Sequence, residues 1–343
     1  MTTATVREAD LADADERARI AAFVDATAAA TPFHLPAWSI AVARGCGQRA
    51  RYLVAERGGT ITGVLPLTEM RSPLFGRALV SAGFAVDGGV LGDAAVEPLA
   101  AAAWELAQRR GCPSVELRGG AVPAGWDSDA DSYLGFARDL AADDDAELLA
   151  IPRKQRAEVR RALGLDLDIA TGRDRAMLAE HYRVYAESVR NLGTPVFPAQ
   201  LFRSVVETMD ADVLTVRHRG RAVASVLSLY HRGTVYPYWG GGTEAARGLR
   251  ANDRMYFALM AHARARGCTR FDFGRSKTGT GAAAFKKNWG FTPVPRLYAK
   301  RSDGPAREVN PLNPKYALMV RSWKKMPLWA ANLAGPWISR GLG

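Results

Sequence analysis

The chain has 343 residues, of which 48% are hydrophobic and 24% charged, a balance typical of a globular protein with room for two domains. Its formal net charge of +11 favours anionic partners such as nucleic acid, nucleotide phosphates or an anionic membrane surface, although surplus solubility charge gives the same value. Composition therefore excludes a disordered or fibrous chain.

Neither cysteines nor apolar runs point to a secreted or membrane-spanning protein. Cys46, Cys112 and Cys268 are odd in number and far apart, which argues against a disulfide framework or a zinc site and fits a reduced cytoplasmic setting. The N-terminus is acidic and polar, unlike a signal peptide. No run of about 18 apolar residues predicts a membrane span.

Two blocks of predicted elements occur twice in the chain. Residues 51–67 and 212–229 each read as strand, tight turn and strand. Residues 104–119 and 259–276 each read as an amphipathic helix that ends in Arg-Gly-Cys, with the glycine as its C-terminal cap, followed by a short strand with one acidic residue. Two blocks in the same order, about 160 residues apart, predict two similar α/β halves.

The two copies differ after their last strand. In the first copy Arg118 leads into the loop 119–128, whereas the strand of the second copy leads into a lysine-rich segment, 271–291. We therefore expect the chemistry on the second half and in the cleft between the halves. The first half is expected to be structural or to bind the acceptor.

A charged stretch joins the copies. Asp143 to Glu147 is acidic and reads as a solvated loop or helix start. The segment 151–167 then predicts a helix whose Arg153, Arg156 and Arg160 share one face. This face is either a solvated surface or, as we favour, a phosphate-binding surface. The basic residues of the helix are Arg153, Lys154, Arg156, Arg160 and Arg161.

Residues 234–267 read as a strand, a glycine-rich loop and a helix. Asn252 or Asp253 is the predicted N-cap of that helix. A loop that enters a helix N-terminus binds anions well, because its free N–H groups and the helix dipole point at the ligand. Of the alternating aromatic residues in the strand, Tyr238 is the predicted exposed member, whereas Tyr236 and Trp239 fit the core.

The segment 271–291 holds a strand, glycines that let the backbone approach a ligand, and the lysines Lys277, Lys286 and Lys287. Such a site suits an anionic donor or a developing oxyanion. No Gly-x-Ser-x-Gly motif or histidine triad pattern is present, which argues against a serine or cysteine hydrolase.

The same segment resembles a known family. Phe285-Lys286 followed by Trp289-Gly290, with RFDFGRSK at 270–277 and Ala-Asn-Asp at 251–253, is similar to the signature of Fem-type (FemAB-like) aminoacyl transferases. Among them it looks most like those associated with exosortase/PEP-CTERM systems. The resemblance covers residues 230–298 most clearly. It implies an α/β fold of two tandem GNAT-like domains, each a mixed, mostly antiparallel sheet flanked by helices.

The resemblance also implies the chemistry, which is attack of an amine on an activated carbonyl. It gives Lys286 the central role, and we expect this lysine to stabilise the oxyanion. Asp272 is the expected base or amine-orienting group, unless it is only a structural partner of Arg275, and Tyr238 is a further catalytic candidate. The expected substrate- or phosphate-binding residues are Arg153, Lys154, Arg156, Arg160, Arg247, Asn252, Arg275, Lys277, Lys287 and Trp289.

Two donors remain open. The resemblance implies aminoacyl-tRNA, whereas acyl-coenzyme A is the alternative on the same fold. Arg247-Gly248 fits the usual coenzyme A pyrophosphate loop only in part, because the glycine follows the arginine directly. The expected acceptor is an amine on an anionic peptidoglycan, exopolysaccharide or other cell-envelope precursor. We expect no tightly bound cofactor and no metal. A non-catalytic nucleic-acid or lipid binder is a weaker alternative, because segment 271–291 is intact.

The last residues, 322–343, are rich in tryptophan and basic at both ends. They suit either a membrane interface or a tail docked on its own domain, and Pro327 and Pro336 are expected to break a long helix. The expected domains are 1–145, 146–300 and a tail, 301–343. The protein is expected in the cytoplasm, peripheral on the inner face of the membrane if the tail meets a bilayer.

Overall fold

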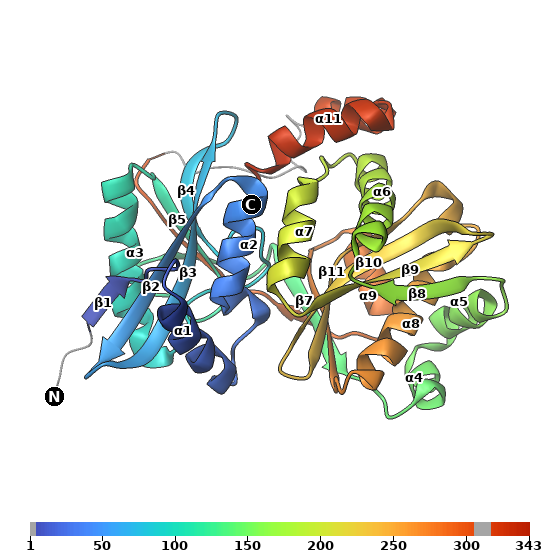
Figure 1. Ribbon diagram of the computed structural model, residues 1–343, viewed down its shortest axis with the longest axis horizontal. Helices are drawn as coiled ribbons and strands as arrows, with labels where there is room; N and C mark the ends of the chain where they lie inside the picture. The colour runs from blue at the N-terminus through green and yellow to red at the C-terminus, as the bar shows by residue number, and fades with distance from the viewer. Residues whose placement is uncertain (1–4, 305–316) are drawn as a thin grey trace.

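The computed structural model describes residues 5–304 and 317–343, and Figure 1 shows two α/β halves side by side. Each half has a seven-stranded mixed sheet, ordered β1-β2-β3-β4-β5-β14-β6 in the first and β8-β9-β10-β11-β12-β7-β13 in the second. Helices flank both sheets, which confirms the predicted fold class.

The elements of the first part of the chain are β1 (Thr5–Glu8), α1 (Ala14–Ala26), η1 (Pro32–His34), α2 (Pro36–Cys46), β2 (Arg49–Arg57), β3 (Thr60–Ser72), β4 (Gly76–Ser81), η2 (Asp93–Ala95), α3 (Val96–Arg110), β5 (Ser114–Arg118), β6 (Asp127–Asp129) and β7 (Tyr133–Asp139). Those of the second part are α4 (Asp144–Ala150), α5 (Arg153–Leu163), β8 (Asp168–Gly172), α6 (Arg175–Leu192), α7 (Ala199–Thr208), β9 (Ala211–His218), β10 (Arg221–His231), β11 (Thr234–Gly242), η3 (Glu244–Ala246), α8 (Ala251–Ala265), β12 (Arg270–Lys277), α9 (Gly281–Asn288), β13 (Pro293–Pro295), β14 (Tyr298–Ser302), α10 (Ala317–Lys325) and α11 (Leu328–Ser339).

The predicted duplication is present in the fold. Hairpin β2–β3 corresponds to hairpin β9–β10, and the parallel pair β4–β5 corresponds to β11–β12. The Arg-Gly-Cys helix ends are also equivalent: the Cys112 N–H donates to Ala107 O and the Cys268 N–H to Ala263 O, both at 2.9 Å. Gly111 and Gly267 have left-handed φ angles of 63° and 79°, which a glycine adopts without strain.

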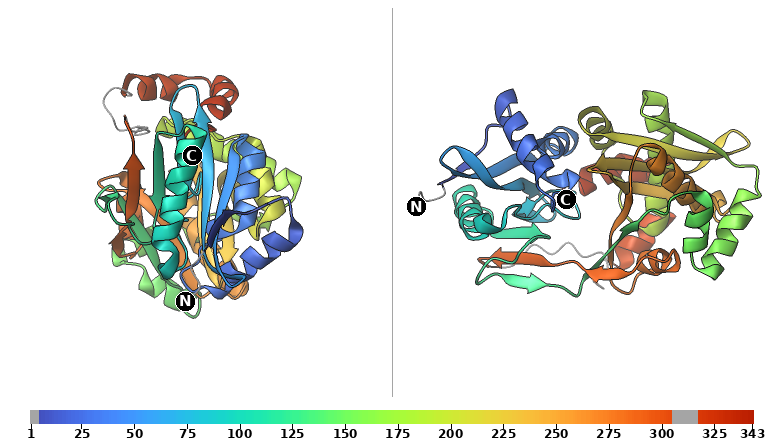
Figure 2. Two further views of the ribbon diagram at one scale, coloured as in Figure 1. Left: turned by 90° about the vertical axis from the view of Figure 1, so that its left-hand side faces the viewer. Right: turned by 90° about the horizontal axis from the view of Figure 1, so that it is seen from below.

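The two sheets exchange a strand in each direction. Strand β7, from the first part of the chain, pairs with β12 in the second sheet, and β14 pairs with β5 in the first sheet. In the right-hand view of Figure 2 the orange strand β14 runs beneath the blue and teal half. The expected domain boundaries at residues 145 and 300 stay a prediction. Strand β7 of the second sheet lies before residue 145, and β14 of the first sheet spans residue 300.

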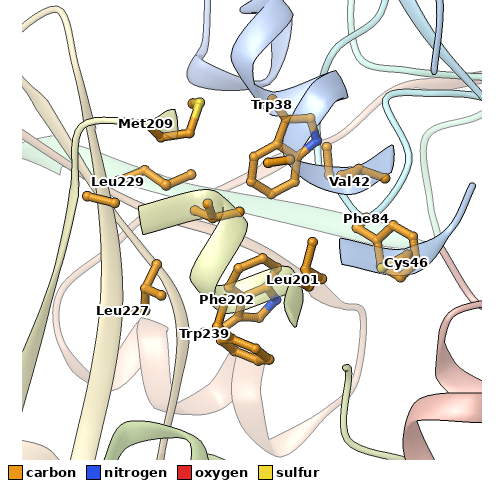
Figure 3. Close-up of a cluster of buried hydrophobic side chains, with 14 of the residues drawn as sticks. Trp38, Val42, Cys46, Phe84, Leu201, Phe202, Met209, Leu227, Leu229 and Trp239 are labelled. Carbon is orange, nitrogen blue, oxygen red and sulfur yellow. The ribbon is translucent and has the colours of Figure 1, made fainter. Parts of the chain in front are cut away.

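A single apolar core joins the halves (Figure 3). Trp38 of α2 stacks on Trp239 of β11 with ring centroids 5.9 Å apart, and Phe202 of α7 lies 4.8 Å from the same Trp239 ring. Helices α2 and α7 come so close that a Cβ at Gly45 would collide with the backbone of Leu201. The cleft between the halves therefore has a fixed geometry.

Three local predictions are wrong. The acidic stretch does start a helix, since Asp143 caps α4, but Glu147 is not solvated. It is fully buried, and Arg138 and Arg264 bind its carboxylate, because burying a carboxylate requires such partners. Helix α8 begins at Ala251, so the predicted N-caps Asn252 and Asp253 lie in its first turn. In the tail, Pro327 separates α10 from α11 as expected, but Pro336 lies within α11. Residues 305–316 of the expected tail are outside the described residues.

The exchange of β7 can be tested through Phe136, which is fully buried in the core of the second half. We expect Phe136→Ala to lower the free energy of unfolding by about 3–5 kcal/mol, because it leaves a cavity in that core. Urea unfolding measures this change. Leu74→Ala, at an exposed site, is the control and is expected to change the value by less than about 0.5 kcal/mol. An equally small loss for Phe136→Ala would contradict the placement of β7.

Candidate active site

The site begins where the parallel strands β11 and β12 separate. Their ladder consists of only Thr234–Arg270 and Val235–Phe271, after which the strands diverge. Both strands also carry a β-bulge just beyond this point: Tyr238 is the extra residue of β11, and Gly274, with φ 65°, lies in the bulge of β12. Bulges interrupt a ladder and redirect side chains and carbonyls, and these two lie in the β10–β11 and β7–β12 ladders on either side of the gap between β11 and β12.

Lys286 binds the bulge of β12. Its ammonium donates to Phe273 O at 2.6 Å and to Arg275 O at 3.0 Å. An ammonium group has three N–H donors, so one remains for a ligand. Burial is the main cause that lowers the pKa of Lys286 to about 8, with Asp272 opposing the shift. Lys286 is thus a positioned cation that is still mostly protonated at neutral pH.

Asp272 belongs to a charge network that crosses the cleft. Its Oδ1 accepts from the Gly274 N–H at 2.7 Å, and its Oδ2 lies 3.4 Å from Arg296 Nη2. The other nitrogen of Arg296 lies 3.1 Å from Asp87 Oδ2, on the first half. Burial raises the pKa of Asp272, so its carboxylate is a stronger base than an exposed aspartate. The ion-pair partner of Asp272 is therefore Arg296, and not Arg275 as the structural alternative for this acid supposed.

A loop of the first half covers the gap. Three successive carbonyls of this loop accept hydrogen bonds: Phe84 O from Tyr238 OH at 2.5 Å, Ala85 O from Arg118 Nη1 at 2.9 Å, and Val86 O from Tyr298 OH at 2.9 Å. Tyr238 is thus half-buried and holds the loop, and burial raises its pKa far above the usual range. These bonds place Val86 opposite the bulge of β12.

A cavity of about 150 Å³ lies between the two halves at this point. Asp272, Arg275 and Lys286 line it together with Phe33 and Val86 of the first half. Arg275 also lines two adjoining cavities of about 110 and 210 Å³, both of which Arg118 borders. A larger hollow of about 710 Å³ lies between α1 and α2, but its wall holds no acid or histidine, so we assign the chemistry to the cleft.

Arg275 is the cation at the junction of these cavities. Its guanidinium donates to the hydroxyl of Tyr298 and lies 4.3 Å from the ring centroid of Tyr133. Lys277, at the end of β12, pairs in register with Tyr133. The structure thus places the predicted catalytic residues Tyr238, Asp272 and Lys286 around one cavity with the predicted binding residue Arg275, and their roles stay a prediction.

A second hollow of about 430 Å³, lined by charged side chains of both signs, lies on the other side of α9. Lys154 of α5, Arg250 at the start of α8 and Lys287 of α9 line it, opposite Glu158 and Asp253. Burial raises the pKa of Asp253 to about 6. Lys286 and Lys287 are neighbours in sequence, but their side chains serve different hollows.

The remaining predicted binding residues do not line either hollow. Arg153, Arg160 and Arg247 are exposed. Arg156 instead donates to Ile151 O at 3.0 Å and Leu149 O at 2.7 Å, so its guanidinium holds the α4–α5 connection. Asn252 Oδ1 is buried and has no hydrogen-bond partner among the described residues.

Trp289 belongs to the core of the second half. Its side chain is fully buried and packs against Phe285 and Tyr256, so the predicted binding role is wrong.

Sequence reasoning also missed residues that the structure brings to the cleft. Arg118 follows the duplicated acidic residue Glu116 and could have been noticed there, whereas Asp87, Arg296 and Tyr298 lie outside every motif.

Comparisons with known proteins agree with this architecture. Residues 146–287 match the acetyltransferase (GNAT) domain family, and no curated protein matches the chain. Among solved structures, FemX is similar with a TM-score of 0.67 and 16% identity, over 82% of this chain and 95% of its own. The C-terminal domain of a putative lysylphosphatidylglycerol synthetase from Agrobacterium fabrum gives 0.59 and 15%, over 84% and 93%.

A tandem GNAT protein from the clavulanic acid biosynthesis pathway is also similar, with a TM-score of 0.54 and 15% identity, over 89% of this chain and 100% of its own. At these identities the likeness concerns the fold. Residues 146–287 therefore form a GNAT acetyltransferase domain, which supports an acyltransferase, and the chain as a whole has the tandem-GNAT fold that it shares with FemX.

Proposed function

We propose that this protein transfers an aminoacyl or acyl group to an amine and forms an amide, in the manner of Fem-type enzymes. One observation carries the proposal: the Lys286 ammonium is fixed by two carbonyls of the β12 bulge, in the wall of a cavity that also contains the Asp272 carboxylate. This pairs a cation for a developing oxyanion with a base for the amine proton.

The reaction follows from this geometry. The acceptor amine attacks the carbonyl carbon of the donor ester or thioester, and the remaining N–H of Lys286 stabilises the oxyanion that forms. Asp272 accepts the proton that the amine loses. The carbonyl re-forms as the bond to the leaving oxygen or sulfur breaks, and that atom takes up the proton that Asp272 accepted. Walls from both halves hold the two substrates in place, which supplies the proximity that such a reaction needs.

Aminoacyl-tRNA is the donor that the residues favour. The acid Asp253 occupies the first turn of α8, on the wall of the second hollow, where a coenzyme A pyrophosphate would meet its negative charge. The exposed cations Arg153, Arg160 and Arg247 offer a broad surface for a nucleic-acid backbone instead. The alternative is acyl-coenzyme A, and the match of residues 146–287 to the acetyltransferase (GNAT) domain family supports it.

The proposed acceptor is an amine on an anionic cell-envelope precursor, of the peptidoglycan or exopolysaccharide class. Arg118, Arg275 and Lys300 around the adjoining cavities provide positive charge beside the reacting groups. The name of the lysylphosphatidylglycerol synthetase relative describes an aminoacylated envelope lipid. We place the reaction in the cytoplasm, at the inner face of the membrane. The association with exosortase/PEP-CTERM systems stays a prediction.

Lys286 and its neighbour Lys287 are expected to have different roles, and one substitution at each residue tests this. Lys286→Met is expected to lower kcat about 10²- to 10³-fold, the usual effect of removing one oxyanion donor. Lys287→Met, in the second hollow, is expected to raise the KM for the donor and leave kcat nearly unchanged. Steady-state transfer assays on both variants, with thermal unfolding to check folding, measure this. Full kcat in Lys286→Met would remove the central claim.

The pH dependence follows from the lowered pKa of Lys286. Only the protonated lysine stabilises the oxyanion, so kcat should fall as pH rises through about 8. Arginine stays protonated over this range, so Lys286→Arg, whatever its residual rate, should lose this alkaline limb. A pH–rate profile from pH 6 to 10 measures both proteins. If Lys286→Arg keeps the same limb, another group titrates.

Donor choice is tested by binding at two salt concentrations. Charged tRNA is expected to bind in a salt-sensitive manner, and Arg153→Gln and Arg160→Gln should each reduce the salt slope by about 1. Arg57→Gln, at an exposed arginine on the first half, is the matched control. Saturable binding of acyl-coenzyme A thioesters without tRNA binding would favour the alternative donor.

A further inference from the structure

The C-terminal helices pack against the second half and leave one face exposed. Figure 1 shows α11 outside both sheets, above α6 and α7. Its inner stripe of small residues, Ala331, Gly335 and Ser339, is buried. Ser339 Oγ donates to Val196 O at 2.7 Å, and a Cβ at Gly335 would lie 3.0 Å from Val196 N. The helix is thus held closely against the protein.

The opposite face of α11 carries large apolar side chains in solvent. Trp329, Leu333 and Trp337 are 73%, 77% and 51% exposed, and their i, i+4, i+8 spacing places them on one stripe. Met319, in the preceding helix α10, is also exposed, at 58%. Burying this stripe in an apolar medium is favourable, so its exposure marks an interaction surface. We call Trp329, Leu333 and Trp337 the outer stripe.

The charges around the outer stripe define the chemistry of its partner. Residues 317–343 contain no Asp or Glu. Their four basic side chains are all exposed and are those of Arg321, Lys324, Lys325 and Arg340. Tryptophan and basic residues beside an apolar stripe match the boundary between lipid headgroups and acyl chains. No helix of the described ranges is both long and apolar enough to cross a bilayer, and the 12 residues of α11 extend only about 18 Å.

We propose that the outer stripe docks on the surface of an anionic lipid bilayer, with α11 lying in the plane of the interface. Trp329, Leu333 and Trp337 enter the boundary between headgroups and acyl chains, while Lys324 and Lys325 contact lipid phosphates. A second copy of this chain is a poorer partner, because the charged side chains of residues 317–343 are all positive and two such segments would repel each other.

The docked helix is linked directly to the cleft. Leu342, just after α11, lines the 110 and 210 Å³ cavities together with Arg118 and Arg275. Docking through α11 therefore brings this side of the cleft to the membrane surface. The docking inference does not depend on the proposed acyl transfer, since it rests on the outer stripe and the basic side chains of residues 317–343.

Vesicle co-sedimentation of the full chain tests the proposal. Vesicles of phosphatidylcholine with 30% phosphatidylglycerol are compared with vesicles of phosphatidylcholine alone, at low and physiological salt. We expect binding to the anionic vesicles to be at least tenfold tighter, and weaker at higher salt. The variant Trp329→Ser/Leu333→Ser/Trp337→Ser should lose at least tenfold in affinity, and Lys324→Gln/Lys325→Gln should lose the preference for phosphatidylglycerol.

Controls separate docking from non-specific adhesion and from loss of fold. Leu74→Ser/Leu149→Ser removes exposed apolar side chains elsewhere and should bind as the unchanged protein does. Circular dichroism and thermal unfolding verify each variant. Unchanged binding by the triple variant, or no binding of the unchanged protein to anionic vesicles, would overturn the proposal. A dimer in light scattering that only the triple variant abolishes would assign the stripe to a second copy. None of these outcomes depends on transfer activity.

Discussion

The close packing of α2 on α7 is the contact on which the cleft depends. Gly45 lets the two helices touch at Leu201, and Trp38 stacks on Trp239 in the core that they share. Trp239 follows Tyr238 in β11, so the same packing sets where the Tyr238 hydroxyl meets Phe84 O. A larger residue at Gly45 would push the halves apart and separate the walls of the site. Stability and site geometry therefore depend on the same few side chains.

The charges of the cleft are arranged around backbone irregularities. The bulge of β12 leaves carbonyls without ladder partners, and a lysine one element later in the chain binds them. Arg296 lies between the carboxylates of Asp87 and Asp272, so each half contributes one acid to a common cation. Buried charges need such partners, and the shared arginine ties the correct alignment of the halves to the ionisation of Asp272.

Local patterns predicted much of this protein. The repeated hairpins and Arg-Gly-Cys helix ends specify the two halves because they are set by short-range periodicity and capping. Lys286 and Asp272 were found because they lie within one continuous segment. Asp87, Arg118, Arg296 and Tyr298 were missed as a group, since only the exchange of β14 brings residues near 87 and 118 beside those near 297. The binding role predicted for Trp289 was wrong for another reason: an aromatic residue in a signature fills a core as readily as it contacts a ligand.

The exchange of strands has a consequence for synthesis on the ribosome. The outer edge of β5 pairs with β14. Strand β5 ends at Arg118 and β14 begins at Tyr298, so β14 is synthesised 180 residues after β5. At about 5–20 residues per second, the nascent first sheet keeps that edge open for on the order of ten seconds or more. An open edge pairs readily with other strands. Each newly made chain thus passes through an interval in which shielding by a chaperone matters more than it does for a domain whose strands are contiguous.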